Sequence, residues 1–518
     1  MIDLPPQRIR VAAHPGEAGA CDLLAPGGGL ERAIPYYEDR VEQRTMSAAV
    51  ARALADERPL IVEAGTGTGK TLAYLIPALQ SGKRVVVSTG TRALQDQIAR
   101  YDIPLLRTIL ARPFAAVVLK GVSNYVCRRR LAEAVSRGGA GAELGALVDW
   151  SEHSETGDRS EVEWLAESAP LWSEVTTTPD ARIGPRCPYF ERCFVTQARR
   201  LAEKAELILV NHHLYFADRA LRAAHPGARV LPEHDAVIFD EAHQLEDVAT
   251  EHFGARVSTH KLGQLVRDAH LALARMPLWT GHAADDVIHA VERAGISLFA
   301  LIRGELISAN ESRMPLPPGL FDGPDRQAAW FKLDNALEEL ARTAEAESEP
   351  PPDEEPSEDA GARASLTGLA RRARELRDDL ATIAEQRQKS HVYWGEVRPT
   401  GTLLTASPIE VGDLVRRHIV TSGPTPIFTS ATLTAAGDFS YQRTRLGLGD
   451  PSTCDELLVP SPFDYAKQAL LYVPRDLPAP ADDSFSAAAA QRTLELLEIT
   501  GGRAFLLFTS HRALRDAA

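Results

Sequence analysis

The stretch Glu63-Ala64-Gly65-Thr66-Gly67-Thr68-Gly69-Lys70-Thr71 decides how this chain is expected to fold. It follows the apolar run Pro59–Val62 and leads into Thr71–Leu79, where apolar residues recur at helical spacing. We therefore expect a buried strand, a tight glycine loop and a helix. Glycines let the loop turn its backbone N–H groups toward phosphate oxygens, and the positive N-terminal end of the helix adds to that field. The stretch predicts a nucleotide-phosphate site.

Two side chains of the loop have a direct chemical part in that site. Lys70 would reach the β- and γ-phosphates, and the Thr71 hydroxyl would ligate Mg²⁺. The residues predicted to hold the nucleotide are Ala64, Gly65, Thr66, Gly67, Thr68, Gly69, Lys70 and Thr71. Ala64 stands where the usual motif has its first glycine. The alternative is a glycine-rich turn that binds nothing, which the flanking strand and helix patterns disfavour.

A second motif lies about 170 residues further on, at Val237–His243. Here an apolar strand pattern ends in two carboxylates. Asp240 would hold Mg²⁺ through water, Glu241 would polarise the attacking water, and His243 would link the γ-phosphate to the rest of the protein. The alternative, an acidic start of a solvated helix, fits poorly with the apolar run before it. With Lys70, these three residues are the predicted catalytic group of an ATP hydrolase.

Composition sets broader limits. A chain of 518 residues is expected to hold more than one domain, and its 44% hydrophobic content is typical of globular proteins. No segment resembles a membrane span or a signal peptide, so we expect a cytoplasmic, nucleoid-associated protein with no membrane partner. Five cysteines do not suggest a disulfide framework. The net charge of −14 neither predicts nor excludes nucleic-acid binding, since a groove needs only a local basic lining.

The pattern along the chain predicts an α/β core with interruptions. Alternating strand and helix patterns before residue 115 indicate a parallel sheet covered by helices. Residues 116–195 break that pattern, and residues 256–390 look helical apart from the stretch 344–359. That stretch has eight acidic residues, four prolines and no Lys or Arg, so we expect a disordered loop. Further strands are expected at residues 83–89, 207–210, 237–239, 426–429, 469–473 and 504–508.

This layout, with long insertions on both sides of the Asp-Glu-Ala-His motif, resembles the DinG/XPD-like family of iron–sulfur superfamily 2 DNA helicases, closest to the bacterial DinG and YoaA type. Tyr37–Gln43 resembles the family's adenine-recognition motif, in which Gln43 would bond the adenine edge and Tyr37 would pack on its face. A plain surface helix start is the alternative for this segment. The resemblance implies contacts to nucleic acid from Thr91, Arg92, Ser430 and Thr432, in the motifs Thr89–Arg92 and Ser430–Thr432.

The resemblance also implies a fold. It is an α/β protein with a RecA-like parallel-sheet motor domain, an iron–sulfur insertion and a helical arch insertion, plus an incomplete second RecA-like domain. The implied divisions are motor domain 1 in three parts (1–115, 196–255 and 391–440), the iron–sulfur insertion (116–195), the arch insertion (256–390) and a truncated motor domain 2 (441–518). The family's second motor domain continues to an arginine that reaches the γ-phosphate. Only eight residues follow Ser510, so a truncated, weakly hydrolysing form is expected.

The cysteines depart from the family pattern. The resemblance implies a 4Fe-4S cluster on Cys127, Cys187 and Cys193 together with a fourth cysteine, and Arg182 stands at that fourth position. A guanidinium stays protonated and donates only, so it cannot replace a thiolate ligand. Three hypotheses remain open: a cluster with a different ligand on its fourth iron, a labile 3Fe-4S form, or no cluster.

The function implied by the resemblance is 5′-to-3′ translocation on single-stranded DNA with unwinding of forked or tailed duplexes in repair or replication. ATP and Mg²⁺ would be the cofactors, and unidentified replication or repair proteins the partners. One alternative is an ATP-gated nucleic-acid binding protein without processive unwinding. Another is an RNA helicase, since the residues alone do not separate RNA from DNA.

Overall fold

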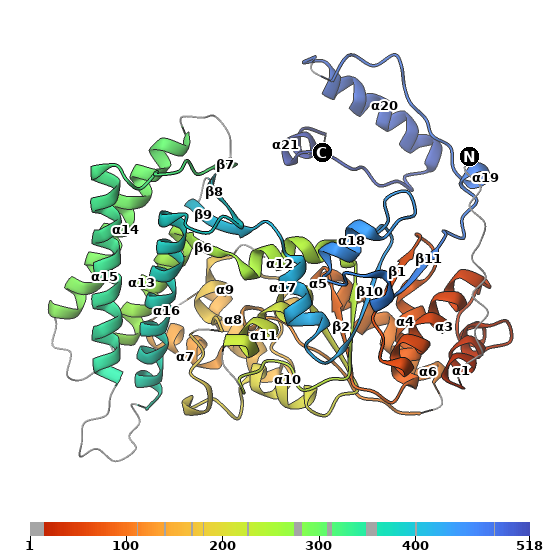
Figure 1. The fold of residues 1–518 in the computed structure, drawn as a ribbon, viewed down its shortest axis with the longest axis horizontal. Helices are drawn as coiled ribbons and strands as arrows, with labels where there is room; N and C mark the ends of the chain where they lie inside the picture. Colours follow the sequence, from red (N-terminus) through yellow and green to blue (C-terminus); the bar gives the residue numbers. More distant parts are fainter. Residues whose placement is uncertain are drawn as a thin grey trace. The chain divides into compact units, whose positions relative to one another are not determined.

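The computed structural model describes residues 15–110, 112–138, 141–166, 169–179, 181–224, 227–273, 282–307, 313–348, 360–398, 401–480 and 482–517. They form two compact units, one ending at Pro462 and the other beginning at Phe463. Helices and strands are mixed throughout the first unit (Figure 1). No helix in these ranges is both long and apolar enough to cross a membrane.

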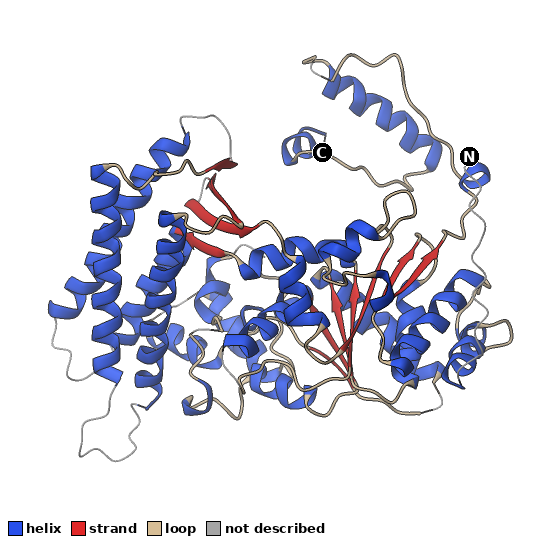
Figure 2. Ribbon diagram, in the orientation of Figure 1, coloured by secondary structure: helices blue, strands red, loops and turns tan. Residues whose placement is uncertain are grey.

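A seven-stranded parallel sheet forms the centre of the first unit (Figure 2). In spatial order its strands are β11 (Asp455–Val459), β1 (Leu60–Ala64), β10 (Thr425–Ser430), β5 (Ala236–Asp240), β2 (Val85–Thr89), β4 (Leu207–Asn211) and β3 (Ala116–Val118). Every neighbouring pair is parallel, so the carboxyl ends of all the strands lie at one edge. The predicted α/β fold with a RecA-like parallel sheet is confirmed.

Helices cover both faces of this sheet, because strands of a parallel sheet are buried on both sides. Along β1, Leu60 and Val62 face one hydrophobic core, and Ile61 faces the other. The first core is covered by α1 (Pro15–Leu24), α2 (Gly29–Ala33), α3 (Val41–Asp56), α4 (Lys70–Gln80) and α6 (Ile103–Ile109). The second is covered by α10 (Phe194–Ala202), α11 (His212–Ala224), α12 (Leu245–Phe253) and α17 (Gly412–Val415).

The segment between β3 and β4 is a small subdomain with its own core. Its helices are α7 (Arg128–Ser136), α8 (Ala142–His153) and α9 (Pro170–Val175), and α10 leads back to the sheet. Leu147 and Val162 are fully buried at its centre. Lys120 is also buried here, with Nζ 2.8 Å from a carboxylate oxygen of both Asp96 and Asp158. We call residues 119–195 the first insertion.

The second insertion combines four long helices with a small antiparallel sheet (Figures 1 and 2). The helices are α13 (Thr259–Leu273), α14 (His282–Ile307), α15 (Pro324–Ser348) and α16 (Ala360–Glu385). The sheet has the order β6 (Ala255–Ser258), β9 (Gly401–Pro408), β8 (His391–Arg398) and β7 (Arg313–Pro315). We therefore define the second insertion as residues 255–408.

Two expectations about this insertion are wrong. Residues 391–408 do not return to the motor, because β8 and β9 bury Tyr393 and Leu404 in the same core as the helices. The acidic stretch 344–359 is not a loop from its start, because α15 continues to Ser348 and Ala344 is fully buried in the core. Residues 349–359 lie outside the described part of the chain.

The expected boundary at residue 441 is also wrong, because β11 pairs with β1 and belongs to the first sheet. In the second unit, helices α19 (Tyr465–Gln468), α20 (Phe485–Thr500) and α21 (His511–Ala517) are present. The predicted strands at 469–473 and 504–508 are wrong, since no described segment pairs with them and side chains such as Leu470 are 94% exposed. A strand requires a neighbouring strand for its N–H and C=O groups.

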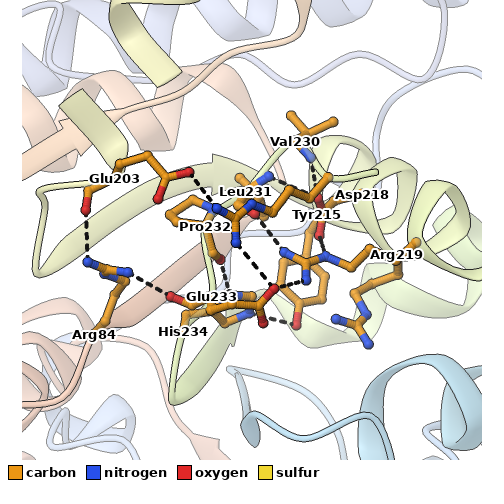
Figure 3. A network of polar contacts seen from close by, with 12 residues as sticks. Arg84, Glu203, Tyr215, Asp218, Arg219, Val230, Leu231, Pro232, Glu233 and His234 are labelled. Carbon is orange, nitrogen blue, oxygen red and sulfur yellow. Dashed lines mark hydrogen bonds and ion pairs between the residues drawn. The ribbon is translucent and has the colours of Figure 1, made fainter. Parts of the chain in front are cut away.

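A buried polar network holds the segment that leads into β5 (Figure 3). The fully buried Asp218 carboxylate accepts hydrogen bonds from the backbone N–H groups of Val230 and Leu231, at 2.6 and 2.9 Å. It also accepts one from Arg222 Nε at 2.7 Å, and the same guanidinium bonds the exposed Glu233. The network anchors the chain immediately before the strand that carries Asp240.

Candidate nucleotide-binding and coupling site

The glycine loop joins β1 to α4 at the carboxyl edge of the sheet, as its sequence predicts. Gly67 and Gly69 have φ of 87° and 76°, a left-handed conformation that strains other residues. A Cβ at Gly69 would lie 2.3 Å from Gln43 Nε2, which donates to the Gly69 carbonyl at 3.0 Å. Gln43 thus contacts the loop backbone, while the half-buried Tyr37 donates its hydroxyl to Leu24 at 2.5 Å. Their roles toward adenine stay predictions.

The start of the loop is held by the segment after β11. Gly65 N–H donates to the Val459 carbonyl at 3.0 Å, and the Ser461 hydroxyl donates to the Thr66 carbonyl at 2.8 Å. A Cβ at Gly65 would approach the Ser461 nitrogen to 2.5 Å. The buried Thr68 closes the turn by donating its hydroxyl to the Gly65 carbonyl at 2.6 Å. Position 65 must therefore be glycine, because a side chain there would collide with the backbone of Ser461.

The first side chain of α4 faces the carboxylates at the end of β5. Lys70 Nζ lies 3.5 Å from Glu241 Oε1, and both side chains are mostly buried. One turn later, the Tyr74 hydroxyl donates to Asp240 Oδ2 at 3.0 Å, and the Thr71 side chain bonds Tyr74. The loop lysine, the helix hydroxyl and both carboxylates therefore meet, as predicted from two motifs far apart in the sequence. A hydroxyl and a buried carboxylate are the oxygen donors that Mg²⁺ prefers.

Asp102, at the end of the π-helical turn Ile98–Asp102, is a member of this site that no motif signals. Burial, followed by the charge of Glu241, raises the pKa of Asp240 to about 6. Burial, followed by the charge of Asp240, likewise raises the pKa of Asp102 to about 6. Asp102 Oδ2 is buried without a hydrogen-bond partner among the described residues. Burial and neighbouring negative charge therefore make both carboxylates costly to ionise without a nearby positive charge.

Ser430, the last residue of β10, connects two residues of the Asp-Glu-Ala-His motif, Glu241 and His243. Its hydroxyl donates to Glu241 Oε2 at 3.1 Å and lies 2.8 Å from His243 Nδ1. Since the hydroxyl proton is directed at the carboxylate, His243 Nδ1 must carry a hydrogen and donate to Ser430. Glu241 itself has φ of 57°, a conformation that costs a non-glycine residue about 1–3 kcal/mol. The hydrogen bond from Ser430 therefore links Glu241, whose backbone is strained, to the end of β10.

Glu63, directly before the loop, holds the same segment from the other side. Its carboxylate accepts hydrogen bonds at 2.6 Å from the N–H groups of both Leu433 and Thr434. The Thr434 hydroxyl donates to the second carboxylate oxygen at 3.0 Å. Residues 430–434 are thus bound to the phosphate loop and to the Asp-Glu-Ala-His motif together, and no sequence motif signals this role of Glu63.

The residues expected to touch nucleic acid occupy different environments. Thr91 caps α5 (Arg92–Gln97) by accepting from Leu94 N–H at 3.2 Å, and both Thr91 and Thr432 are exposed. Arg92 is exposed and donates to Asn124 at 2.9 Å. Ser430, however, is fully buried, so the expectation that it contacts nucleic acid is wrong. Its hydroxyl is directed into the protein, between Glu241 and His243.

The three cysteines of the first insertion line one small cavity together with Arg182. Burial raises the pKa of the Cys127 thiol. Burial also acts to raise the pKa of Cys193, but hydrogen bonds from Thr196 and the positive charge of Arg182 outweigh it and lower that pKa. The structure therefore brings together the cysteines that the sequence pattern grouped.

Comparisons with known proteins agree with this geometry. Residues 44–130 match the DEAD/DEAH box helicase family, and residues 181–262 match the DEAD_2 family. The ATP-dependent DNA helicase YoaA of Escherichia coli is 36% identical over 502 residues, which cover 96% of this chain and 75% of that protein. The chain belongs to the DinG/YoaA family of ATP-dependent DNA helicases.

A second relative and one solved structure cover similar shares of this chain. The ATP-dependent helicase DinG of Mycobacterium tuberculosis H37Rv is 31% identical over 509 residues, covering 92% of this chain and 72% of that protein. A solved structure entitled XPD_Helicase matches with a TM-score of 0.47 at 15% identity, covering 93% of this chain and 74% of that one. Membership of the DinG/YoaA family confirms the prediction of a helicase-type ATP hydrolase.

Proposed function

We propose that this chain uses ATP hydrolysis to move 5′-to-3′ along single-stranded DNA and to unwind tailed or forked duplexes. Its similarity to DNA helicases supports DNA as the substrate, and the proposed setting is the cytoplasmic nucleoid. In the proposed reaction Lys70 binds the β- and γ-phosphates, and Thr71 and Asp240 hold Mg²⁺. Glu241 orients the attacking water, and the charge that develops on the γ-phosphate is stabilised by the loop N–H groups.

The Ser430 hydroxyl, which bridges Glu241 and His243, is the observation that carries the proposal. A nucleotide that moves Glu241 would alter this bridge and shift residues 430–434, where Thr432 is exposed. Exposed Thr91 and Arg92 lie after β2, at the same edge of the sheet. We propose that these three residues contact the DNA backbone and that Ser430 transmits the state of the nucleotide to them.

We further propose that the two insertions form one arch that divides the duplex. Asp268 on α13 supports a joint structure, because it accepts hydrogen bonds from Arg130 on α7 at 2.6 Å and from Arg372 on α16 at 2.7 Å. All three side chains are at most 13% exposed. A shared buried ion cluster favours movement of the insertions as a unit.

Strand displacement on duplexes with a 5′ tail, with a 3′ tail or made of RNA tests the proposal. We expect ATP-dependent unwinding of 5′-tailed DNA, abolished in Lys70→Ala. In Ser430→Ala we expect ATP binding to persist while DNA-stimulated hydrolysis falls about 10–100-fold, the effect of losing one hydrogen bond to a charged group. Unwinding confined to RNA or to 3′-tailed DNA would overturn the assigned substrate or polarity. ATP-dependent DNA binding without any strand separation would favour a gated binding protein.

A further inference from the structure

The cavity between the three cysteines is small and Arg182 forms part of its wall. Its volume is about 30 Å³, room for about two water molecules. A 4Fe-4S cluster has eight heavy atoms and is normally held by four thiolates. Among the described residues, no three His, Cys, Asp or Glu side chains are placed to hold a metal ion. The residues present therefore do not fit a four-thiolate cluster.

Arg182 has specific contacts in this cavity. Its Nη2 donates to Thr196 Oγ1 at 2.7 Å, and its guanidinium carbon lies 5.9 Å from the centre of the Phe190 ring. Its Nε is buried and has no hydrogen-bond partner in the described part of the chain. Thr196 also bonds the Cys193 thiol, so the guanidinium and the thiol share one neighbour. The position that a fourth thiolate would need is therefore filled by a guanidinium, which neighbouring side chains hold in place and which cannot ligate iron.

The chain around the cavity is also held by contacts that need no metal. The Arg128 guanidinium donates to the Arg192 carbonyl at 3.0 Å and to the Ser151 carbonyl at 2.8 Å. It further bonds the Glu152 carboxylate at 2.9 Å and lies 4.5 Å from the centre of the Phe194 ring. One side chain thus joins the segment next to Cys193 to α8. Together with the separate hydrophobic core of the first insertion, it closes the fold around the cysteines.

We infer that the first insertion of this chain is a cluster-independent form, in which Arg182 occupies the fourth ligand position and is held there by Thr196 and the Phe190 ring. A guanidinium keeps its proton under all ordinary conditions, so it supplies a positive charge and donors where a ligand would supply negative charge. The contacts of Arg182 and Arg128 replace metal–thiolate bonds as the local crosslink. This inference does not depend on the direction of unwinding.

Metal analysis of the full chain, purified without oxygen, tests the inference. Iron and acid-labile sulfide per chain are compared in the wild type, Cys193→Ser and Arg182→Cys. We expect the wild type to match Cys193→Ser, and Arg182→Cys to gain iron and sulfide together. Limited proteolysis of the wild-type insertion should be unchanged by a chelator or by peroxide. Iron and sulfide in the wild type that disappear in Cys193→Ser would overturn the inference, whether or not Arg182→Cys folds.

Discussion

Asp218 provides a direct test of how β5 and its carboxylates are held (Figure 3). Arg222 bonds two carboxylates, Asp218 with 0% exposure of its side chain and Glu233 with 73%. Removing one partner of a buried pair costs about 3–5 kcal/mol, because the other charge remains buried. An exposed pair contributes about 0–1 kcal/mol. Asp218→Ala should therefore destabilise the segment far more than Glu233→Ala, although both remove a partner of the same arginine.

Hydrogen exchange, measured by mass spectrometry on peptides covering residues 227–235, reports how much each substitution destabilises this segment. Since Asp218 accepts from the N–H groups of Val230 and Leu231, a loss of 3 kcal/mol predicts about 100-fold faster exchange there in Asp218→Ala. Glu233→Ala should change exchange by no more than about fivefold. Asp218→Asn, which retains an acceptor for the N–H groups but no charge, should lie between them. Equal exchange in the two alanine variants would refute the argument that burial decides the strength of this network.

Three further predictions follow from other parts of the molecule. Gly69→Ala should lower affinity for a fluorescent ATP analogue at least about tenfold, because the added Cβ is strained at positive φ and meets a side chain at 2.3 Å. Gly82→Ala, at φ of 69° with open space around it, is the matched control and should bind normally. Asp268→Ala should lower the free energy of opening the junction between the insertions by about 3–5 kcal/mol and so speed proteolysis there. Glu345→Ala removes a partner from an exposed ion pair and should leave the proteolysis rate unchanged. Burial lowers the pKa of His252 to about 4, so the folded state keeps this side chain neutral while the unfolded chain takes up a proton below about pH 6.5. The free energy of unfolding should therefore be about 2 kcal/mol lower at pH 5 than above pH 6.5, because of this one side chain. Urea unfolding at the two pH values should show this loss in the wild type and not in His252→Gln.

Five of the seven strands of the first sheet were predicted because their signals are local, whereas the edge strands β3 and β11 were missed. Strands such as β1, β2 and β5 are short, uninterrupted apolar runs, which parallel strands buried on both faces require. The antiparallel strand β8 was missed, although alternate residues such as Tyr393 and Gly395 are buried. Its partner β7 is separated from it in the sequence by the long helices α15 and α16, and its partner β9 follows it directly. The strong helical pattern of α15 and α16 therefore outweighs the short strand signals beside them. The predicted strands at 469–473 and 504–508 failed because β-propensity alone supplies no neighbour.

The sequence by itself determined the chemistry of the two motifs, because the glycine turn, the helix after it and the strand ending in carboxylates depend only on neighbouring residues. It also determined that Arg182 stands at a position where the related pattern has a ligand. Only the tertiary structure decided which groups meet. The parallel register sets Glu63 beside Ser430, and Thr429 beside Asp240, so the Ser430 hydroxyl comes to lie between Glu241 and His243. Such contacts depend on strand order and burial, and neither is encoded within any one segment of the chain.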